Sequence, residues 1–262
     1  MKVCLLNDCS DSRHFGCELV KKAYLHHFEK RGVELVRSYA KRETWDPYVL
    51  DSVDLVIVNA EGTVHHGKHA RLLDVGVEYN SVFINSVFQE NLYANWELNQ
   101  FNFVSVRESM SRDDMIDNHK YEPVVVPDLI FTHADMFMNT RGDRRIGTFV
   151  SNSSTRITPG MPVTADCKDP EFVQKLSQSE NAVCGRFHAL CIAAMLDIPF
   201  SVYPGNTHKI EGIMRDMRAS ENYHATAEAA HANIPETVSS TVQAYVRDAP
   251  GRIDAMFDEI LR

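Results

Sequence analysis

Segment 181–196 holds the residues best suited to chemistry, because charged and imidazole side chains begin a predicted helix there. Arg186 and His188 follow Gly185, directly after a strand predicted at 181–185. Free backbone N–H groups at such a helix start, the helix dipole and an arginine together favour a phosphate or a carboxylate. We therefore predict an anion-binding site at Arg186 and His188.

The next polar loop has residue types that suit a nucleotide. Thr207 is predicted to cap a helix over 207–218 that carries Lys209 and Glu211 in its first turns. Cations on successive loops can hold a pyrophosphate, and a glutamate can hold a ribose diol. The alternative for Lys209 and Glu211 is a solvated surface turn. The chain lacks Asp-x-Asp, the usual metal–nucleotide motif, so we expect binding without a metal or other cofactor.

A carboxylate ends a predicted strand in the first half of the chain. Glu61 closes the strand expected at 54–62, and Gly62 permits a tight turn before His65 and His66. A carboxylate at a strand end suits a general base. Alternatively, Glu61 is buried and bonds neighbouring loop amides, because a buried carboxylate needs partners. The histidines lack the His-Glu-x-x-His spacing of a zinc helix, which disfavours a metal site there.

The loop 7–17, between the first predicted strand and the first predicted helix, is also polar. Asp11 or Ser12 can cap the helix, whereas capping explains His14 less easily. A helix start favours anions, and Arg13 adds a cation there. We therefore treat Asp11, Arg13 and His14 as candidate site residues.

Arg107 ends a strand predicted at 101–108. It is either a clamp for an anion or the partner of a nearby carboxylate, Glu108 or Asp128. The sequence leaves both interpretations open.

Strand and helix patterns alternate along the chain and indicate the fold class. Strand-like apolar runs lie at 2–7, 33–39, 54–62, 81–88, 101–108, 122–131, 146–151, 181–185 and 199–204. Helical patterns lie at 14–31, 68–79, 111–120, 169–178, 186–196 and 207–218, with a helical tail over 236–262 interrupted near Pro250 and Gly251. Repeated strand–helix–strand units predict parallel sheets covered on both faces.

Segment 133–145 shows neither a strand pattern nor a helix pattern and is interpreted as a linker. It divides the chain into an N-terminal domain over 1–135 and a C-terminal domain over 146–262. We expect an α/β protein with two Rossmann-like halves whose parallel sheets face a cleft. Ligands in such folds bind at the carboxyl ends of the strands.

Composition favours a globular protein of the cytoplasm. The 262 residues carry a net charge of −9, and 44% of them are hydrophobic. No stretch approaches the ~20 apolar residues of a membrane span. Asp8 follows the first apolar run too closely for a signal peptide. The six cysteines form no Cys-x-x-Cys pair and are expected to be reduced and mostly structural.

The acidic excess argues against non-specific nucleic-acid binding. One basic cluster, Arg37, Lys41 and Arg42, has Tyr39 and Trp45 nearby. These residues could face a phosphate backbone and stack on bases, or they could form a solvated loop.

The same motifs resemble the polysaccharide pyruvyl transferase family. The matching blocks, in family order over residues 1–212, are NDCSDSRHFGCELV, VIVNAEGTVHH, VSVRESMS, VVPDLIF and GRFHALCIAAMLDIPFSVYPGNTHKIEG, of which the last is the most specific. That family is similar in fold to two-domain glycosyltransferases of the GT-B type, including sialyltransferase-like enzymes. The resemblance therefore implies group transfer to a hydroxyl.

In that family an Arg-x-His at this helix start contacts the phosphate of phosphoenolpyruvate, which corresponds to Arg186 and His188 here. An arginine of the first half also reaches the phosphate, and Arg107 matches it. The chain departs from the family in being short, in reading NAEG instead of a glycine triplet, and in reading HFGC where many members have Gly-Asp. Some compact members of such folds look like phage enzymes that glycosylate hydroxylated DNA bases.

The first hypothesis is a metal-independent glycosyltransferase that uses a UDP- or CMP-type nucleotide sugar and a glycan or a hydroxylated DNA base as acceptor. Glu61, or failing that Asp11 or His14, would take the proton from the acceptor hydroxyl. The expected donor-binding residues are Arg186, His188, Lys209, Glu211, Arg107 and Thr207. The expected acceptor-binding residues are His65, His66 and Arg13.

The second hypothesis is pyruvyl transfer from phosphoenolpyruvate to a glycan. It needs a small, strongly cationic pocket, and a glutamate beside the donor disfavours it. The third is a non-catalytic nucleotide- or sugar-binding protein, which the polar residues at several separate strand ends disfavour. The sequence does not determine the oligomeric state.

Overall fold

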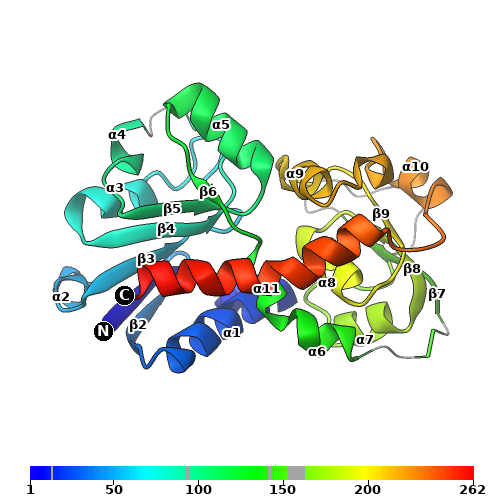
Figure 1. The fold of residues 1–262 in the computed structure, drawn as a ribbon, viewed down its shortest axis with the longest axis horizontal. Coiled ribbons are helices and arrows are strands. Elements are labelled where there is room, and N and C mark those ends of the chain that lie inside the picture. Colours follow the sequence, from blue (N-terminus) through cyan, green and yellow to red (C-terminus); the bar gives the residue numbers. More distant parts are fainter. Residues whose placement is uncertain (13, 92–94, 141–142, 145, 153–162) are drawn as a thin grey trace. The chain divides into compact units, whose positions relative to one another are not determined.

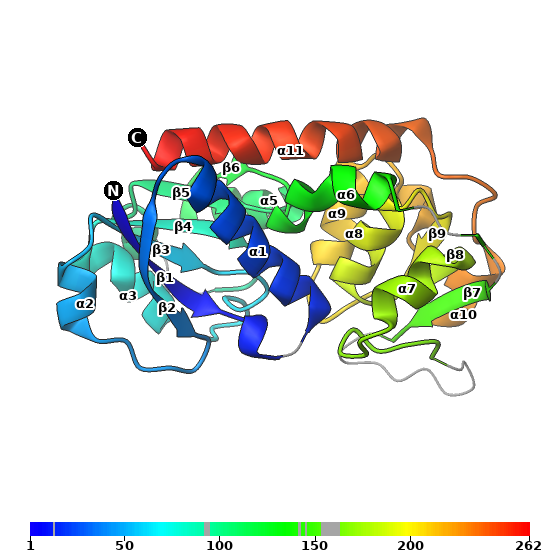
Figure 2. The ribbon, with the colours of Figure 1, turned by 90° about the horizontal axis from the view of Figure 1, so that it is seen from below.

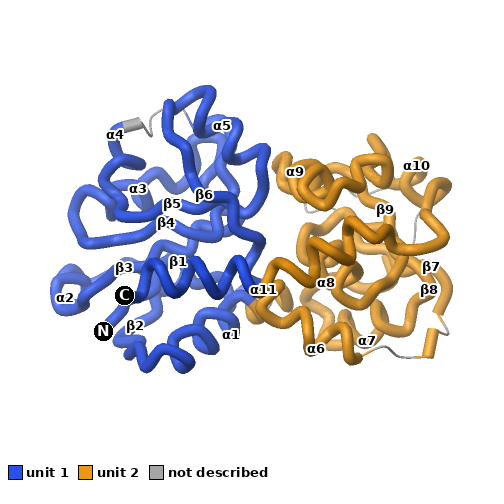
Figure 3. Tube along the Cα trace, in the orientation of Figure 1, with its two compact units in different colours: residues 1–12, 20–129, 251–262 blue, residues 13–19, 130–250 orange. Residues whose placement is uncertain are grey.

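The computed structural model describes residues 1–12, 14–91, 95–140, 143–144, 146–152 and 163–262. The chain divides into two compact units (Figure 3). Unit 1 contains residues 1–12, 20–129 and 251–262, and unit 2 contains residues 13–19 and 130–250. The predicted domains, 1–135 and 146–262, differ from these units mainly at two segments. Residues 13–19 belong to unit 2, and residues 251–262 belong to unit 1.

Unit 1 is built on a six-stranded parallel sheet in the order β2-β1-β3-β4-β5-β6 (Figure 1). Its strands are β1 (Lys2–Asp8), β2 (Glu34–Ala40), β3 (Leu55–Asn59), β4 (Ser81–Ser86), β5 (Phe103–Val106) and β6 (Val124–Val125). Every residue of β3, β4 and β5 is buried, as expected for strands covered on both faces. Because β2 and β3 flank β1, the topological switch point lies between β1 and β3.

Helices cover both faces of this sheet. On one face, strand residues such as Cys4, Val58 and Phe83 form a core with side chains from α2 (Pro47–Asp51), α3 (Arg71–Glu78), α4 (Asn95–Leu98) and α5 (Ser109–His119). The other face is covered by residues 20–30 of α1 (Phe15–Lys30) and residues 251–260 of α11 (Ser240–Ile260) (Figure 2). Tyr24 of α1 meets Phe257 of α11 edge to face, with ring centroids 5.9 Å apart.

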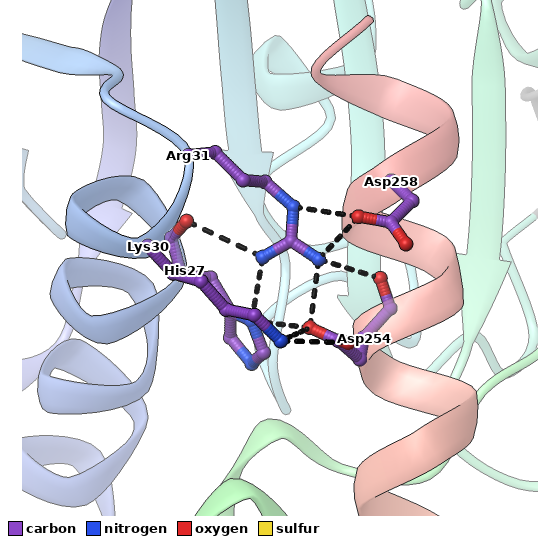
Figure 4. Close-up of polar contacts among 5 residues, drawn as sticks. All are labelled: His27, Lys30, Arg31, Asp254 and Asp258. Atoms are coloured by element: carbon purple, nitrogen blue, oxygen red, sulfur yellow. Dashed lines mark hydrogen bonds and ion pairs between the residues drawn. The ribbon is translucent and has the colours of Figure 1, made fainter.

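An ion-pair cluster also joins α1 to the end of α11 in unit 1 (Figure 4). Arg31 donates to the carboxylates of Asp254 and Asp258, with N–O distances of 2.7 Å to each. Lys30 Nζ lies 2.8 Å from Asp254. The last turns of α11 are thus held to unit 1 by charge as well as by apolar packing.

Unit 2 contains a three-stranded parallel sheet in the order β7-β8-β9, formed by β7 (Ile146–Ser151), β8 (Ser179–Cys184) and β9 (Phe200–Val202). Its helices are α6 (Ala134–Met138), α7 (Phe172–Ser177), α8 (Phe187–Met195), α9 (Lys209–Asp216) and α10 (Ala227–Ala232), with residues 240–250 of α11. Val150 packs with α10 on one face, and Phe149 meets Phe172 of α7. Helix α8 is buried along its whole length, in keeping with its apolar sequence.

The expected α/β class with parallel sheets is confirmed, but some local predictions are wrong. The strand predicted at 122–131 shrinks to β6, because Pro127 has no N–H to continue the ladder. The residues that follow form the 3-10 helix η2 (Leu129–His133). The linker predicted at 133–145 contains α6. The tail helix is not interrupted, since α11 continues through Pro250.

Short helices with little periodic signal were not predicted at all, namely α2, α4, α10 and the 3-10 turns η1 (Ser10–Ser12) and η3 (Ser220–Asn222). In the part of the chain that the structure describes, no helix is both long enough and apolar enough to cross a membrane.

Candidate functional site

The carboxyl edge of the unit 1 sheet brings buried amide side chains together at the switch point between β1 and β3. Asn7 Nδ2 donates to the Asn59 carbonyl at 2.6 Å and to Thr63 Oγ1 at 3.2 Å. Asn59 Nδ2 donates back to the Asn7 carbonyl at 3.3 Å, and Asn85 Nδ2 donates to Asn59 Oδ1 at 3.3 Å. These hydrogen bonds fix a buried polar network at the position where open α/β sheets usually bind their ligands.

Glu61, the predicted general base, is held beside these amides. Its side chain is 5% exposed, and Oε1 accepts a hydrogen bond from Asn59 Nδ2 at 3.1 Å. Tyr24 of α1 donates to Asn59 Oδ1 at 3.2 Å. Burial raises the pKa of Tyr24 well above its ordinary value, and the charge of Glu61 adds to this shift. Glu61 thus does bond a neighbouring amide, and a carboxylate fixed in this way can also accept a proton.

The other candidates in unit 1 lie in separate turns. His65 is buried and His66 is exposed, and their Nδ1 atoms lie 2.6 Å apart. His66 Nε2 also lies 3.4 Å from Glu90, which can pair with it when it is protonated. Asp11 is exposed within η1. Arg13 lies outside the described residues.

Of the two interpretations of Arg107 that the sequence leaves open, the structure shows the pairing with a carboxylate. Its guanidinium lies 2.6 Å from the Asp128 carboxylate, and the two side chains are 2% and 0% exposed. Breaking such a buried pair would leave an uncompensated charge at a cost of about 3–5 kcal/mol. Arg107 is therefore the partner of a carboxylate within unit 1. The other predicted partner, Glu108, instead caps α5 by accepting from the Ser111 N–H at 3.0 Å.

The carboxyl edge of the unit 2 sheet carries the predicted anion site. Arg186 directly precedes α8, and its guanidinium lies 3.6 Å from Asp166 with a quarter of the side chain exposed. His188, in the first turn of α8, is 8% exposed. The helix is nine residues long and buried, so its dipole acts at Arg186 with little screening. A helix start and an arginine at one strand end favour a phosphate.

His14 joins this cluster from the loop that precedes α1. Its ring meets that of His188 edge to face, with centroids 5.5 Å apart. Its buried Nδ1 has no hydrogen-bond partner within the described ranges. Burial lowers the pKa of His14 to about 3, and the neighbouring His188 and Arg186 act in the same direction. His14 is therefore neutral at pH 7, and Arg186 supplies the positive charge for an anion.

Gly16 allows these two histidines to approach each other. A Cβ atom at position 16 would lie 2.0 Å from His188 Nδ1, which is far inside van der Waals contact. One residue further on, Cys17 completes a group with His14 and His188, whose ligand atoms all lie within 4.8 Å of one another. Cysteine was expected to be mostly structural. The signal in the sequence that would have singled out Cys17 is its His-x-x-Cys spacing from His14.

The loop before α9 differs from its prediction at Thr207. Helix α9 begins at Lys209 with His208 as its N-cap, so Thr207 stands outside the helix and does not cap it. Thr207 Oγ1 is instead buried with no hydrogen-bond partner in the described part of the chain. Lys209 Nζ donates to Asn206 Oδ1 at 2.7 Å, and its charge contributes to the lowered pKa of His14. Glu211 is exposed on the first turn of α9.

Two residues that the sequence did not single out also belong to this edge. Asn152 follows β7, and its Oδ1 is buried without a hydrogen-bond partner among the residues described. Asp166 pairs with Arg186. Neither stands in a recognisable motif, so only their places at the strand ends indicate a role. Asn152, Arg186, Lys209 and Thr207 together make an edge suited to a polar, anionic ligand, and Asp166 holds the Arg186 guanidinium at that edge.

Comparison with known proteins gives information on the fold of this chain but none on its activity. No protein-family model matches the sequence, and no curated protein matches it significantly. The structure is similar to a crystal structure of a functionally uncharacterised protein from Klebsiella pneumoniae subsp. pneumoniae NTUH-K2044, with a TM-score of 0.61 and 14% identity. The match covers 86% of this chain and 92% of that chain. The two proteins thus share a fold.

Proposed function

We propose that the protein is a transferase that binds a nucleotide sugar in unit 2 and moves its glycosyl group to an acceptor hydroxyl. The observation that carries this proposal is the carboxyl edge of the β7–β9 sheet, where Arg186 begins α8 and Lys209 begins α9. Buried, unpartnered oxygens of Asn152 and Thr207 follow strands of the same sheet. An unsatisfied buried polar group costs about 1–3 kcal/mol, which a hydroxyl-rich ligand could recover by donating hydrogen bonds.

Each part of this edge suits one part of a nucleotide sugar. Arg186 and the start of α8 suit the diphosphate, and Lys209 adds a second positive charge. Ribose and sugar hydroxyls can donate to Asn152 Oδ1, and Glu211 can accept from a ribose diol. The unit 2 edge thereby offers contacts to the hydroxyl groups of the donor as well as to its phosphates.

In the proposed reaction, the bond between the anomeric carbon and a phosphate oxygen of the nucleotide breaks, and the acceptor oxygen bonds to that carbon. Arg186 stabilises the negative charge that develops on the leaving nucleotide. The proton of the acceptor hydroxyl passes to a base, for which the buried carboxylate of Glu61 in unit 1 is the first candidate. Acceptor binding at the unit 1 edge, with His65 and His66 nearby in sequence, is part of the same proposal.

The Arg107–Asp128 pair weighs against the phosphoenolpyruvate alternative. Pyruvyl transfer calls for a second arginine on the donor phosphate, and Arg107 was its candidate. That arginine is already neutralised by a buried carboxylate. A nucleotide sugar makes no such demand on unit 1.

The test is a thermal-shift panel of UDP, CMP, GDP, UDP-sugars and phosphoenolpyruvate on the full chain. A ligand at 100 times its Kd stabilises the native state by about 2.7 kcal/mol, which raises Tm by several degrees. We expect a nucleotide to do so, and Arg186→Gln to abolish the shift. The matched control is Arg247→Gln, which replaces an exposed arginine of the same unit.

A shift with phosphoenolpyruvate and with no nucleotide would replace the proposal by pyruvyl transfer. No shift with any compound of the panel, at concentrations up to millimolar, would overturn the donor site itself. A nucleotide shift that persists in Arg186→Gln would move the donor site away from α8. After a nucleotide hit, acceptor assays would use glycans and hydroxylated DNA in parallel.

A further inference from the structure

We propose that His14, Cys17 and His188 form a binding site for one zinc-like divalent transition metal ion. These three residues were expected to serve other roles, and the absence of standard metal-binding spacings argued against a metal. The structure places a ligand atom of each within 4.8 Å of the other two. They lie in unit 2, so the site is complete within one unit.

The local backbone explains how the three side chains meet. His14 immediately precedes α1, and Cys17 lies in its first turn, three residues later. Residues three apart on a helical turn lie on the same side, which suits a chelating pair. His188 comes from the first turn of α8. Gly16 stands between the pair, and any larger residue there would collide with the ring of His188. The close approach of α8 thus depends on a glycine at this position.

The ligand types indicate which class of metal the site would take. Two imidazoles and a thiolate suit zinc and similar borderline-soft ions, whereas magnesium and calcium require oxygen ligands. In a tetrahedral zinc site with bonds of about 2.0–2.3 Å, neighbouring ligand atoms lie roughly 3.5 Å apart. Side-chain rotations that bring separations of at most 4.8 Å to this spacing would complete the geometry.

The three candidate ligands differ in exposure. Cys17 and His14 are half-buried and His188 is buried, so the group is shielded but not enclosed. Three protein ligands with one open position are typical of catalytic zinc sites. The positive charges of Arg186 and Lys209 act at His14 and oppose a cation there. The carboxylate of Asp166, 3.6 Å from the Arg186 guanidinium, acts in the opposite direction. A Cys17 thiolate would add a further negative charge.

The experiment titrates Co²⁺ alone into the chelator-treated full chain, because cobalt reports thiolate ligation by a charge-transfer band in the near ultraviolet. We expect one equivalent to bind with this band, and zinc to displace it. Cys17→Ser should lose the band. His14→Ala and His188→Ala should weaken binding by more than the roughly 10- to 100-fold that outer-shell residues control. The matched control variants, Cys9→Ser and His26→Ala, should keep both the charge-transfer band and the wild-type affinity for cobalt.

Circular dichroism and thermal melting establish that each variant is folded. If Cys17→Ser does not fold, the wild-type chain still tests the proposal. In the wild-type chain, zinc should protect Cys17 from alkylation, as mapped by peptide mass spectrometry. A band that persists in Cys17→Ser, the absence of any band, or unprotected Cys17 at saturating zinc would each overturn the proposal.

The metal site does not rest on the proposed transferase function. Cobalt binding is measured without a nucleotide, and the nucleotide panel can be repeated with a chelator present. A protein that binds nucleotides but no cobalt refutes the metal site alone. A protein that binds cobalt but no nucleotide refutes the donor site alone.

Discussion

At the scale of single residues, backbone strain gathers where the unit 1 strands end. Asn7, Glu61 and Asn85 adopt positive φ angles of 62°, 36° and 56°. Such angles are unfavourable for residues with a side chain and tend to persist where surrounding contacts fix them, often at functional sites. Here the hydrogen bonds around Asn59 supply those contacts. The strained backbone therefore lies at the same carboxyl edge of the unit 1 sheet as the topological switch point.

Glu61→Gln is predicted to lower transferase activity by about 10²–10⁴-fold, the usual contribution of a general base. The amide keeps the size of the side chain but cannot accept the proton. Nucleotide-induced thermal shifts should not change, because the donor residues lie in unit 2. The steady-state rate and the thermal shift are the two measurements. The control is Glu78→Gln, at an exposed position on α3.

Full activity of Glu61→Gln would exclude Glu61 as the base. In that case Asp11→Asn tests the remaining carboxylate candidate, and His14→Gln tests a residue whose lowered pKa makes it a weak base.

Gly16→Ala is predicted to destabilise the protein by about 1–3 kcal/mol, the usual cost of overpacking. The added methyl would lie 2.0 Å from His188 Nδ1, so the start of α1 and α8 must move apart. Urea denaturation monitored by circular dichroism measures the change. Gly147→Ala is the matched control in unit 2, because a Cβ atom there meets nothing within 4 Å. Equal stability of Gly16→Ala and wild type would contradict the close approach of His188.

At the scale of elements, the pairing of α1 with the end of α11 contains a buried histidine. The His27 ring stacks on Phe257 with centroids 4.2 Å apart. Arg31 can donate to His27 Nδ1, at 3.2 Å. Burial lowers the pKa of His27 to about 3, and Arg31 acts in the same direction. The 3.6 Å approach of His27 to Asp254 is therefore not an ion pair at pH 7.

This histidine should make the protein sensitive to mild acid. In the unfolded chain a histidine takes up its proton near pH 6.5. The unfolded state thus binds the proton first, and the free energy of unfolding falls as the pH drops from about 6.5 toward 3. At pH 5 this single group accounts for a loss of about 2 kcal/mol.

His27→Phe is predicted to make the stability less dependent on pH. Phenylalanine keeps the stack on Phe257 and removes the titrating group, while Arg31 keeps both carboxylate partners. Urea unfolding at pH 7 and pH 5 measures the difference. The exposed neighbour His26, changed to alanine, should leave the wild-type dependence intact. An unchanged pH dependence in His27→Phe would show that His27 is not the responsible group.

At the scale of the whole molecule, the last residues of the chain complete the first unit. Residues 251–262 belong to unit 1, and four of their apolar side chains are buried there: Ile253, Met256, Phe257 and Ile260. Burying each contributes about 1.5–3 kcal/mol. The sum, roughly 6–12 kcal/mol, is comparable to the whole stability of a typical domain. Unit 1 therefore depends on the C-terminus.

Deleting residues 251–262 is predicted to unfold unit 1 selectively. The deletion exposes the apolar side chains of Tyr24 and Phe28, which pack against Phe257. Hydrogen exchange read by mass spectrometry should show lost protection in β1 and β3. Protection should persist in β7 and β8, whose unit keeps its own core. Full protection of β1 in the deletion variant would contradict the division into these units.

The sequence by itself determined the class of the fold and the main candidate residues. Alternating apolar runs and helical patterns are local signals, and so are the polar residues that end each run. For this reason most of the strands, the longer helices, Glu61 after β3 and Arg186 before α8 were predictable. The early end of the strand before Pro127 and the short helices were harder to predict, because a few residues carry little periodic signal.

Only the tertiary structure decided which of these residues meet. The strand order that puts the switch point between β1 and β3, and the choice of Asp128 as the partner of Arg107, depend on sheet pairing. The meeting of Cys17 with His188 joins positions far apart in the chain. The packing of residues 251–262 into unit 1 also joins positions that are far apart in the chain. Such contacts arise from burying faces of elements against one another, and no local pattern specifies which faces will meet.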